Sequence, residues 1–259
     1  MLFRLIQMTA VVLSLFSFNC SQLGFAPEEN SENQILMQAI FGIAAKEGCS
    51  IQKLSPISNT LSYVAPQRVG YDLYNCSLSD LGSLGLIANV SAFEKGLNGH
   101  SPNAILYSSA NVVLPISNGG TNLEISFSLE PGGSLTTYVY GSGTPISGPA
   151  IRLSDSTQEE FYSSMTNGFE TISQGTAALP SNTNLTYCID FQYTNSEQWI
   201  NAWPKRCSQV SQSERNSMMM FPVMQMMDVP SYSGNRIGFV LNGAKLTSFI
   251  IGSILSQVD

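Results

Sequence analysis

The chain has 259 residues, of which only 11% are charged, and its formal net charge is −7. Average soluble proteins contain about 25% charged residues, so Asn, Ser, Thr, Gln and Gly must supply much of the solubility here. The acidic balance, together with the lack of a basic stripe in the sequence, argues against nucleic acids and anionic lipid surfaces as partners. Such partners are bound through clustered Lys and Arg.

The first twenty residues have the pattern of a secretory signal. Arg4 supplies a positive charge, residues 5–18 are almost all apolar, and Asn19 and Ser21 flank Cys20. This order is typical of signal peptides. The apolar stretch is shorter than the roughly 20 residues that span a bilayer, which disfavours the alternative, an uncleaved anchor helix. We therefore expect residues 1–19 to be removed on export.

The number of cysteines points to a separate fate for Cys20, because an odd count in an exported protein leaves one thiol over. Residues 15–20, Leu-Phe-Ser-Phe-Asn-Cys, resemble the relaxed lipobox of spirochaetal lipoproteins of the leptospiral type. Ser17 and Asn19 stand where the usual bacterial lipobox prefers Leu and Gly or Ala. The resemblance covers only the start of the chain. It implies a lipid anchor on Cys20, palmitate included, and attachment to the outer membrane, on either its surface or its periplasmic face.

The mature chain is predicted to begin with a tether and a helix. Residues 20–33 are polar and acidic, which is typical of a flexible linker. Residues 33–46 place apolar side chains at helical spacing, and Gly48 is a suitable stop. A second, weaker helix is predicted over residues 81–93, where glycines interrupt the pattern. We expect residues 34–103 to form a helical and β region that packs on the rest of the chain.

Residues 104–259 change to an alternation of apolar and polar residues, which indicates half-buried strands. Turn residues separate the expected strands, and the Asn242-Gly243 pair is a strong signal for a two-residue hairpin. The expected strands are residues 123–130, 135–140, 187–193, 237–241 and 246–254, with turns at 118–120, 131–133, 194–196 and 242–243. Strands at short intervals predict an antiparallel β-sandwich.

Two of these segments resemble concanavalin-A-like lectins and glucanases. Residues 236–252 are similar to the final strands of those jelly rolls, and residues 123–129, followed by Pro-Gly-Gly, are similar to their early core strands. The resemblance rests on patterning alone. It implies a jelly-roll sandwich and suggests two possible activities, carbohydrate binding and glycoside hydrolysis.

The four cysteines other than Cys20 are predicted to form two disulfides in an oxidising compartment. Cys188 and Cys207 flank a predicted hairpin, so they can lie opposite each other, and Cys49 would then pair with Cys76. Four thiols allow three connectivities, and this one needs no long-range assembly. The alternative, a zinc site, lacks the two-to-four-residue spacing of zinc ribbons.

The sequence offers few groups for catalysis. His100 is the single histidine; neighbouring Gly, Ser and Pro place it in a loop, and no Gly-x-Ser-x-Gly motif surrounds a serine. Glu124 and Glu130 are six positions apart on a face expected to be solvated, and Asp190 stands alone on its strand. No predicted strand carries the acid-x-acid pattern that would place two carboxylates on one face.

Aromatic and sulfur-containing side chains supply the remaining candidates. Trp199 and Trp203 are four positions apart, share a face on a strand, and are candidate carbohydrate-facing aromatics, although core packing also explains them. The methionine-rich residues 218–227 are more typical of a buried strand than of a copper site. We expect no metal or cofactor.

The sequence therefore predicts a lipid-anchored, mainly β envelope protein that binds a protein or a glycan without catalysis. A lectin-like carbohydrate-binding module is one alternative, and a glycoside or ester hydrolase is another.

Overall fold

The structure of the protein is a computed structural model that describes residues 49–55, 57, 68–89, 93–94, 97–113, 119–156, 159–171, 178–194, 197–215 and 231–255. All described residues belong to one compact unit, residues 47–259. The predicted signal, Cys20, the tether, the helix at 33–46 and the methionine-rich residues 218–227 lie outside the described residues. No helix in the described ranges has the length and apolarity to cross a membrane.

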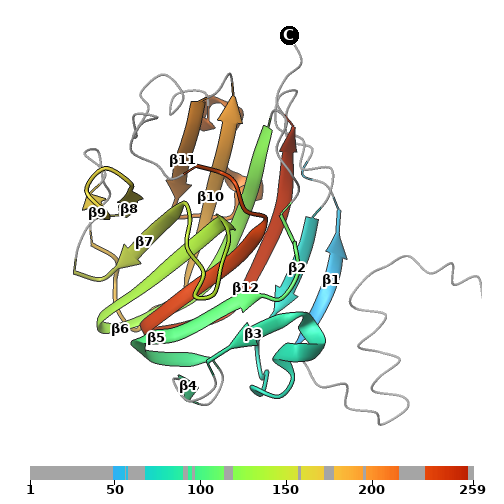
Figure 1. Ribbon diagram of the computed structural model, residues 1–259, viewed down its shortest axis with the longest axis vertical. Coiled ribbons are helices and arrows are strands. Elements are labelled where there is room, and N and C mark those ends of the chain that lie inside the picture. Colours follow the sequence, from blue (N-terminus) through green and yellow to red (C-terminus); the bar gives the residue numbers. More distant parts are fainter. Residues whose placement is uncertain are drawn as a thin grey trace, which may run out of the picture. The chain divides into compact units, whose positions relative to one another are not determined.

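The described part of this unit consists mainly of antiparallel strands (Figure 1). The strands are β1 (Ser50–Leu54), β2 (Arg68–Asp72), β3 (Leu86–Ala88), β4 (Phe93–Glu94), β5 (Asn98–Ser108), β6 (Gly119–Gly141), β7 (Ala150–Ser154), β8 (Glu160–Ser163), β9 (Gly168–Thr171), β10 (Leu185–Thr194), β11 (Glu197–Trp203) and β12 (Arg236–Leu255). Two short 3₁₀ helices, η2 (Leu81–Leu84) and η4 (Cys207–Gln209), lie between strands.

The long strands β6 and β12 organise the fold, because they pair antiparallel along their whole length and belong to two layers. The first half of β6 also pairs with β10, β10 pairs with β11, the second half of β12 pairs with β2, and β2 pairs with β1. We call this layer the front sheet. The other halves of β6 and β12 pair with β7 and β5, and the layer continues through β8, β9, β3 and β4 as the back sheet.

Glycines allow both long strands to bend between the layers. Gly132 and Gly243 have positive φ angles of 77° and 61°, and a Cβ on Gly133 would lie 2.1 Å from the Gly243 carbonyl oxygen. The bend brings the two ends of β6 together, because the hydroxyls of Thr121 and Tyr140 are 2.7 Å apart. Glycine adopts the positive φ angles of Gly132 and Gly243 at little cost, and the missing Cβ of Gly133 makes room for the close approach.

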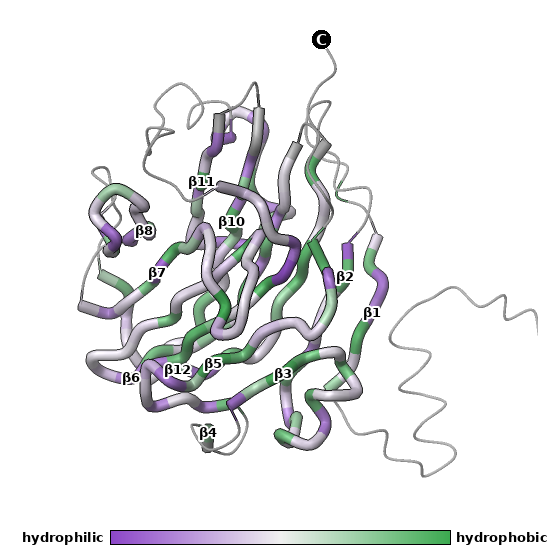
Figure 2. The backbone as a smooth tube through the Cα atoms, in the orientation of Figure 1, coloured by the Kyte–Doolittle hydropathy of each residue, from purple (hydrophilic) through white to green (hydrophobic). Residues whose placement is uncertain are grey.

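The core lies between the two sheets and takes alternate residues from each strand. Leu123, Ile125 and Phe127 of the front sheet and Leu135 and Ile151 of the back sheet are fully or almost fully buried in one cluster. In Figure 2, hydrophobic segments alternate with polar ones along these strands. Burying a side chain of this size contributes about 1.5–3 kcal/mol, so the alternation read from the sequence accounts for the layers.

The fold confirms the predicted antiparallel β-sandwich, but two predicted hairpins are wrong. Residues 131–133 and 242–243 are bends inside β6 and β12 rather than turns, and the segments on either side pair with the other long strand. The predicted helix at residues 81–93 is also wrong, because only Leu81–Leu84 is helical and Leu86–Ala88 forms β3. The hairpin of β10 and β11 is confirmed by the pairing of Thr194 with Glu197.

Candidate functional site

The outer face of the front sheet carries an unusual concentration of polar side chains. Because successive strand residues point to opposite faces, the residues that alternate with the core residues on β6, β10 and β11 point outward. The antiparallel register aligns Asn122 with Asp190 and Asp190 with Asn201. Beside this row lie a second row of Gly120, Gln192 and Trp199 and a third row of Glu124, Cys188 and Trp203. All three polar residues of the first row are at most 3% exposed.

A disulfide fastens the chain segment after β11 to this face. Cys188 of β10 is bonded to Cys207 of η4, and their Cα atoms are 4.7 Å apart. Cys49 is bonded to Cys76 in the same way, with a Cα separation of 4.8 Å. The structure thus contains the pairing expected from the sequence. The Cys188–Cys207 disulfide packs in a small cluster with Ile57, Trp203 and Val210.

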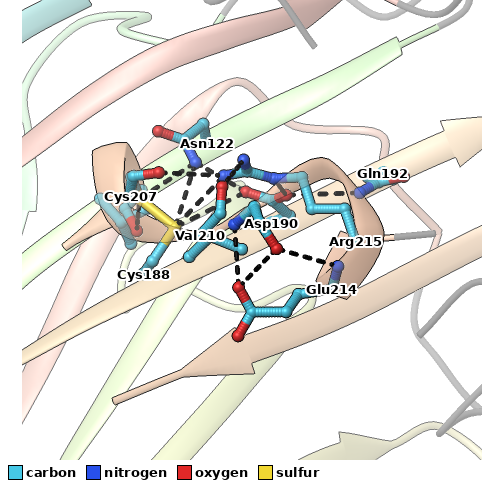
Figure 3. A network of polar contacts seen from close by, with 10 residues as sticks. Asn122, Cys188, Asp190, Gln192, Cys207, Val210, Glu214 and Arg215 are labelled. Atoms are coloured by element: carbon cyan, nitrogen blue, oxygen red, sulfur yellow. Dashed lines mark hydrogen bonds and ion pairs between the residues drawn. A yellow bond between two sulfur atoms is a disulfide. The ribbon is translucent and has the colours of Figure 1, made fainter. Parts of the chain in front are cut away.

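Asp190 is the centre of a buried polar network (Figure 3). One carboxylate oxygen accepts hydrogen bonds from Arg215 Nε at 2.8 Å and Gln192 Nε2 at 3.4 Å, and the other accepts one from Asn122 Nδ2 at 2.6 Å. The Arg215 and Asp190 side chains are 5% and 0% exposed. A buried carboxylate is tolerated when an opposite charge and hydrogen bonds compensate for lost hydration, and all of these are present.

Arg215 also makes contacts within the segment that covers this face, residues 207–215, which we call the covering segment. Its guanidinium donates to the carbonyl oxygens of Val210 at 3.0 Å and Cys207 at 3.4 Å. The same group lies 5.6 Å from the centre of the Trp203 ring. The ion pair, the disulfide and the ring contact therefore hold residues 207–215 against the sheet.

Glu124 is also buried, which corrects the expectation of a solvated side chain. It is 9% exposed, and its Oε2 accepts a hydrogen bond of 2.8 Å from the backbone N–H of Cys207. Burial lowers the pKa of nearby Arg68, and the charge of Glu124 opposes that shift. The sequence pattern correctly assigned Glu124 to the outer face, but the segment that covers this part of the face comes from more than 80 residues later in the chain.

Several polar atoms on this face have no hydrogen-bond partner among the described residues. They are both amide atoms of Asn201, Oδ1 of Asn122 and Nε1 of Trp199. Buried polar groups in native proteins are almost always satisfied by protein, water or ligand. The row of Asn122, Asp190 and Asn201 is therefore buried and keeps unused hydrogen-bonding capacity.

The structure separates the two tryptophans predicted to face a carbohydrate. They share the outer face, as their spacing predicts, but Trp203 is 5% exposed and packs against the disulfide and Arg215. Trp203 is therefore a packing residue here and offers no open ring face. Trp199 is half-buried, and its carbonyl oxygen accepts a hydrogen bond from the hydroxyl of Tyr232.

His100 does not lie in a loop, as the sequence suggested, but in strand β5. Its Nδ1 is 3.1 Å from Glu130 Oε2, and Asn98 Nδ2 donates to the other oxygen of Glu130 at 3.3 Å. The His100 and Glu130 side chains are 36% and 43% exposed. This pair belongs to the back-sheet half of the fold and does not join the outer face of the front sheet. No group of three or more His, Cys, Asp or Glu side chains within the described ranges is arranged to hold a metal ion.

Sequence reasoning missed Asn122 and Arg215. The signal for Asn122 was available, because it occupies the same strand parity as Glu124. Arg215 gave no such signal, since it ends a short helical turn at residues 212–215 and meets Asp190, 25 residues earlier, only in the folded chain.

Comparisons with known proteins find structural likeness only. No protein-family model matches the sequence, and no curated protein matches it. Galectin LEC-6 of Caenorhabditis elegans is 12% identical over 64% of this chain and 95% of its own, with a TM-score of 0.32. The carbohydrate-binding module CBM66 of Bacillus subtilis is 7% identical over 82% and 97%, with a TM-score of 0.31. A β-glucanase of Bacillus licheniformis is 12% identical over 80% and 92%, with a TM-score of 0.28.

Proposed function

We propose that this protein is an exported lipoprotein of the bacterial outer membrane that acts by binding a ligand rather than by catalysis. Support for export comes from the signal-like first twenty residues and from the cysteines. The two disulfides use four of the five cysteines, which leaves Cys20 for a lipid. Disulfides of this kind persist in oxidising compartments such as the periplasm and the cell surface.

The observation that carries binding over catalysis is the state of the carboxylates on the outer face. Asp190 has both oxygens engaged by Arg215, Gln192 and Asn122, and Glu124 accepts from the backbone of Cys207. A glycosidase needs two carboxylates that can reach the scissile bond from either side. Here the covering segment holds both groups in contacts that stabilise the fold.

A glycan is the class of ligand that this face supports best. Sugar hydroxyls both donate and accept hydrogen bonds, as the side-chain amides of Asn122 and Asn201 do. Trp199 beside them is half-buried, and its Nε1–H is a further buried donor without a partner in the described part of the chain. These groups are buried in the free protein, so a ligand must displace the atoms above them. A single sugar ring can enter such a site, whereas the face of a folded protein cannot.

The test uses the full-length protein, expressed in a bacterium that processes lipoproteins and extracted in mild detergent. It is applied to a glycan array and, in parallel, to panels of glycoside and ester substrates. We expect saturable binding of some glycans and no product from any substrate. Turnover that disappears in His100→Ala or Glu130→Gln would contradict the proposal and point to the hydrolase alternative.

A further inference from the structure

A second feature of the outer face is a groove beside the disulfide. Strand β10 begins at Leu185, but its pairing with β11 begins only at Cys188. The start of β10 therefore has no strand beside it on that edge within the described chain. The groove has a volume of about 400 Å³, and its walls include Pro180, Asn184 and Thr186 on one side and residues 204–206 on the other. This volume is within the usual range for small-ligand sites, roughly 300–1,000 Å³.

The groove is cationic in an otherwise acidic protein. Lys205 and Arg206 line it, and no acidic residue is among its lining residues. Lys205 forms an ion pair with Glu214, which does not line the groove. The side chain of Arg206 is exposed, and no carboxylate in the described ranges forms an ion pair with it. Arg206 therefore presents an uncompensated positive charge to the groove.

The backbone on both sides of Arg206 is fixed before any ligand arrives. The N–H of Arg206 donates to Gln209 Oε1 at 3.3 Å, and its carbonyl oxygen accepts from the N–H of Gln209 at 2.9 Å. The next residue, Cys207, is held by its disulfide and by Glu124. A backbone that is already fixed loses no conformational entropy on binding, so only the Arg206 side chain has to be ordered when an anion binds.

We propose that this groove binds a carboxylate-bearing sugar, such as a uronic acid residue of an acidic polysaccharide. The planar guanidinium of Arg206 matches a carboxylate through two parallel hydrogen bonds. The amide of Asn184 and the hydroxyl of Thr186 suit sugar hydroxyls, while Pro180 and Pro204 supply apolar walls for the C–H face of a ring. The inference rests on the proposed binding function and specifies the class of ligand.

The experiment measures binding of an oligogalacturonate to the full-length protein in detergent by titration calorimetry. The same oligosaccharide with methyl-esterified carboxylates is the matched ligand control, because it keeps the sugar chain and removes the charge. We expect the acid to bind at least about tenfold more tightly than the ester, the factor that corresponds to one good charge-assisted interaction.

Two variants that each remove one positive charge, one inside the groove and one outside it, test whether the oligosaccharide binds in the groove. Arg206→Gln should weaken binding of the acid about tenfold or more. Lys53→Gln, at an exposed position of β1 outside the groove, should change it less than about twofold, since a distant exposed charge is largely screened. Both proteins should have the thermal stability of the wild type, because both side chains are exposed.

Three results would overturn the inference. They are equal affinity for acid and ester, full binding by Arg206→Gln, and an acidic peptide of glutamates that binds as tightly as the sugar with the same dependence on Arg206. If the protein binds neutral glycans but not the oligogalacturonate, this inference fails while the proposed binding function stands. Cleavage of the oligosaccharide would instead contradict the proposed function.

Discussion

The buried ion pair between Arg215 and Asp190 gives the sharpest prediction about stability. Arg215→Met keeps an apolar stem near Trp203 but removes the charge that compensates Asp190, whose side chain is 0% exposed. Removing one partner of a buried ion pair typically costs about 3–5 kcal/mol. The whole domain is expected to be stable by about 5–15 kcal/mol, so the loss is a large share of the total.

Thermal unfolding of the non-reduced protein, followed by circular dichroism, measures this loss. For a domain of this size about 2–4 °C corresponds to 1 kcal/mol, so we expect the melting temperature to fall by roughly 6–20 °C. Adding Asp190→Asn to Arg215→Met should recover at least half of the loss, because the uncompensated charge is then gone. Lys205→Met, which breaks an exposed ion pair with Glu214, is the control and should cost less than about 1 kcal/mol.

Either of two results would show that Arg215 does not stabilise the fold by compensating the charge of Asp190. One is a melting temperature of Arg215→Met within about 2 °C of the wild type, which would mean a cost near 1 kcal/mol or less. The other is a double variant no more stable than Arg215→Met, since the loss would then come from packing rather than from the unpaired carboxylate.

Three further predictions follow from the bend, from a buried tyrosine and from the N-terminus. Gly133→Ala should destabilise the protein by about 1–3 kcal/mol in chemical denaturation, since its Cβ would lie 2.1 Å from the Gly243 carbonyl oxygen. Gly82→Ala is the control, because a Cβ there has nothing within 4 Å, and it should change stability by less than about 0.5 kcal/mol. Equal effects of the two variants would contradict the close approach at the bend. Burial raises the pKa of Tyr140, so the folded state keeps a proton that the unfolded state loses above about pH 10. Stability should therefore be intact below that pH and decline as the pH rises above it, and the decline should be shallower in Tyr140→Phe; an unchanged slope would refute this. Cys20→Ala should move the protein from the detergent phase to the aqueous phase, and an unchanged partition after signal removal would rule out the lipid.

The alternation of residues 123–129 was sufficient to predict a strand and its buried face, because burial of every second side chain is a local property of a β-strand. The pairing partner of that strand was not predictable in the same way. Pro131-Gly132-Gly133 is compatible with a tight turn and with a bend, and the choice depends on Gly243, a residue more than 100 positions away. Local signals thus predicted the strands but misassigned two of their connections.

The candidate site shows the same division between local and long-range information. The pairing of Cys188 with Cys207 could be predicted, since both flank one hairpin. The shared face of Trp199 and Trp203 could also be predicted from their spacing. The burial of Trp203 and of Glu124 could not, because both depend on where the segment after β11 returns across the sheet.

The central claim is that the protein binds its ligand and releases it unchanged. The most direct measurement is to capture a mixed library of neutral and acidic glycans on the immobilised full-length protein, elute it, and determine the masses of the bound and unbound fractions by mass spectrometry. We expect a subset of glycans to be retained and eluted at unchanged mass. Glycans shortened or transferred during incubation, or a library that passes through without any retention, would contradict it.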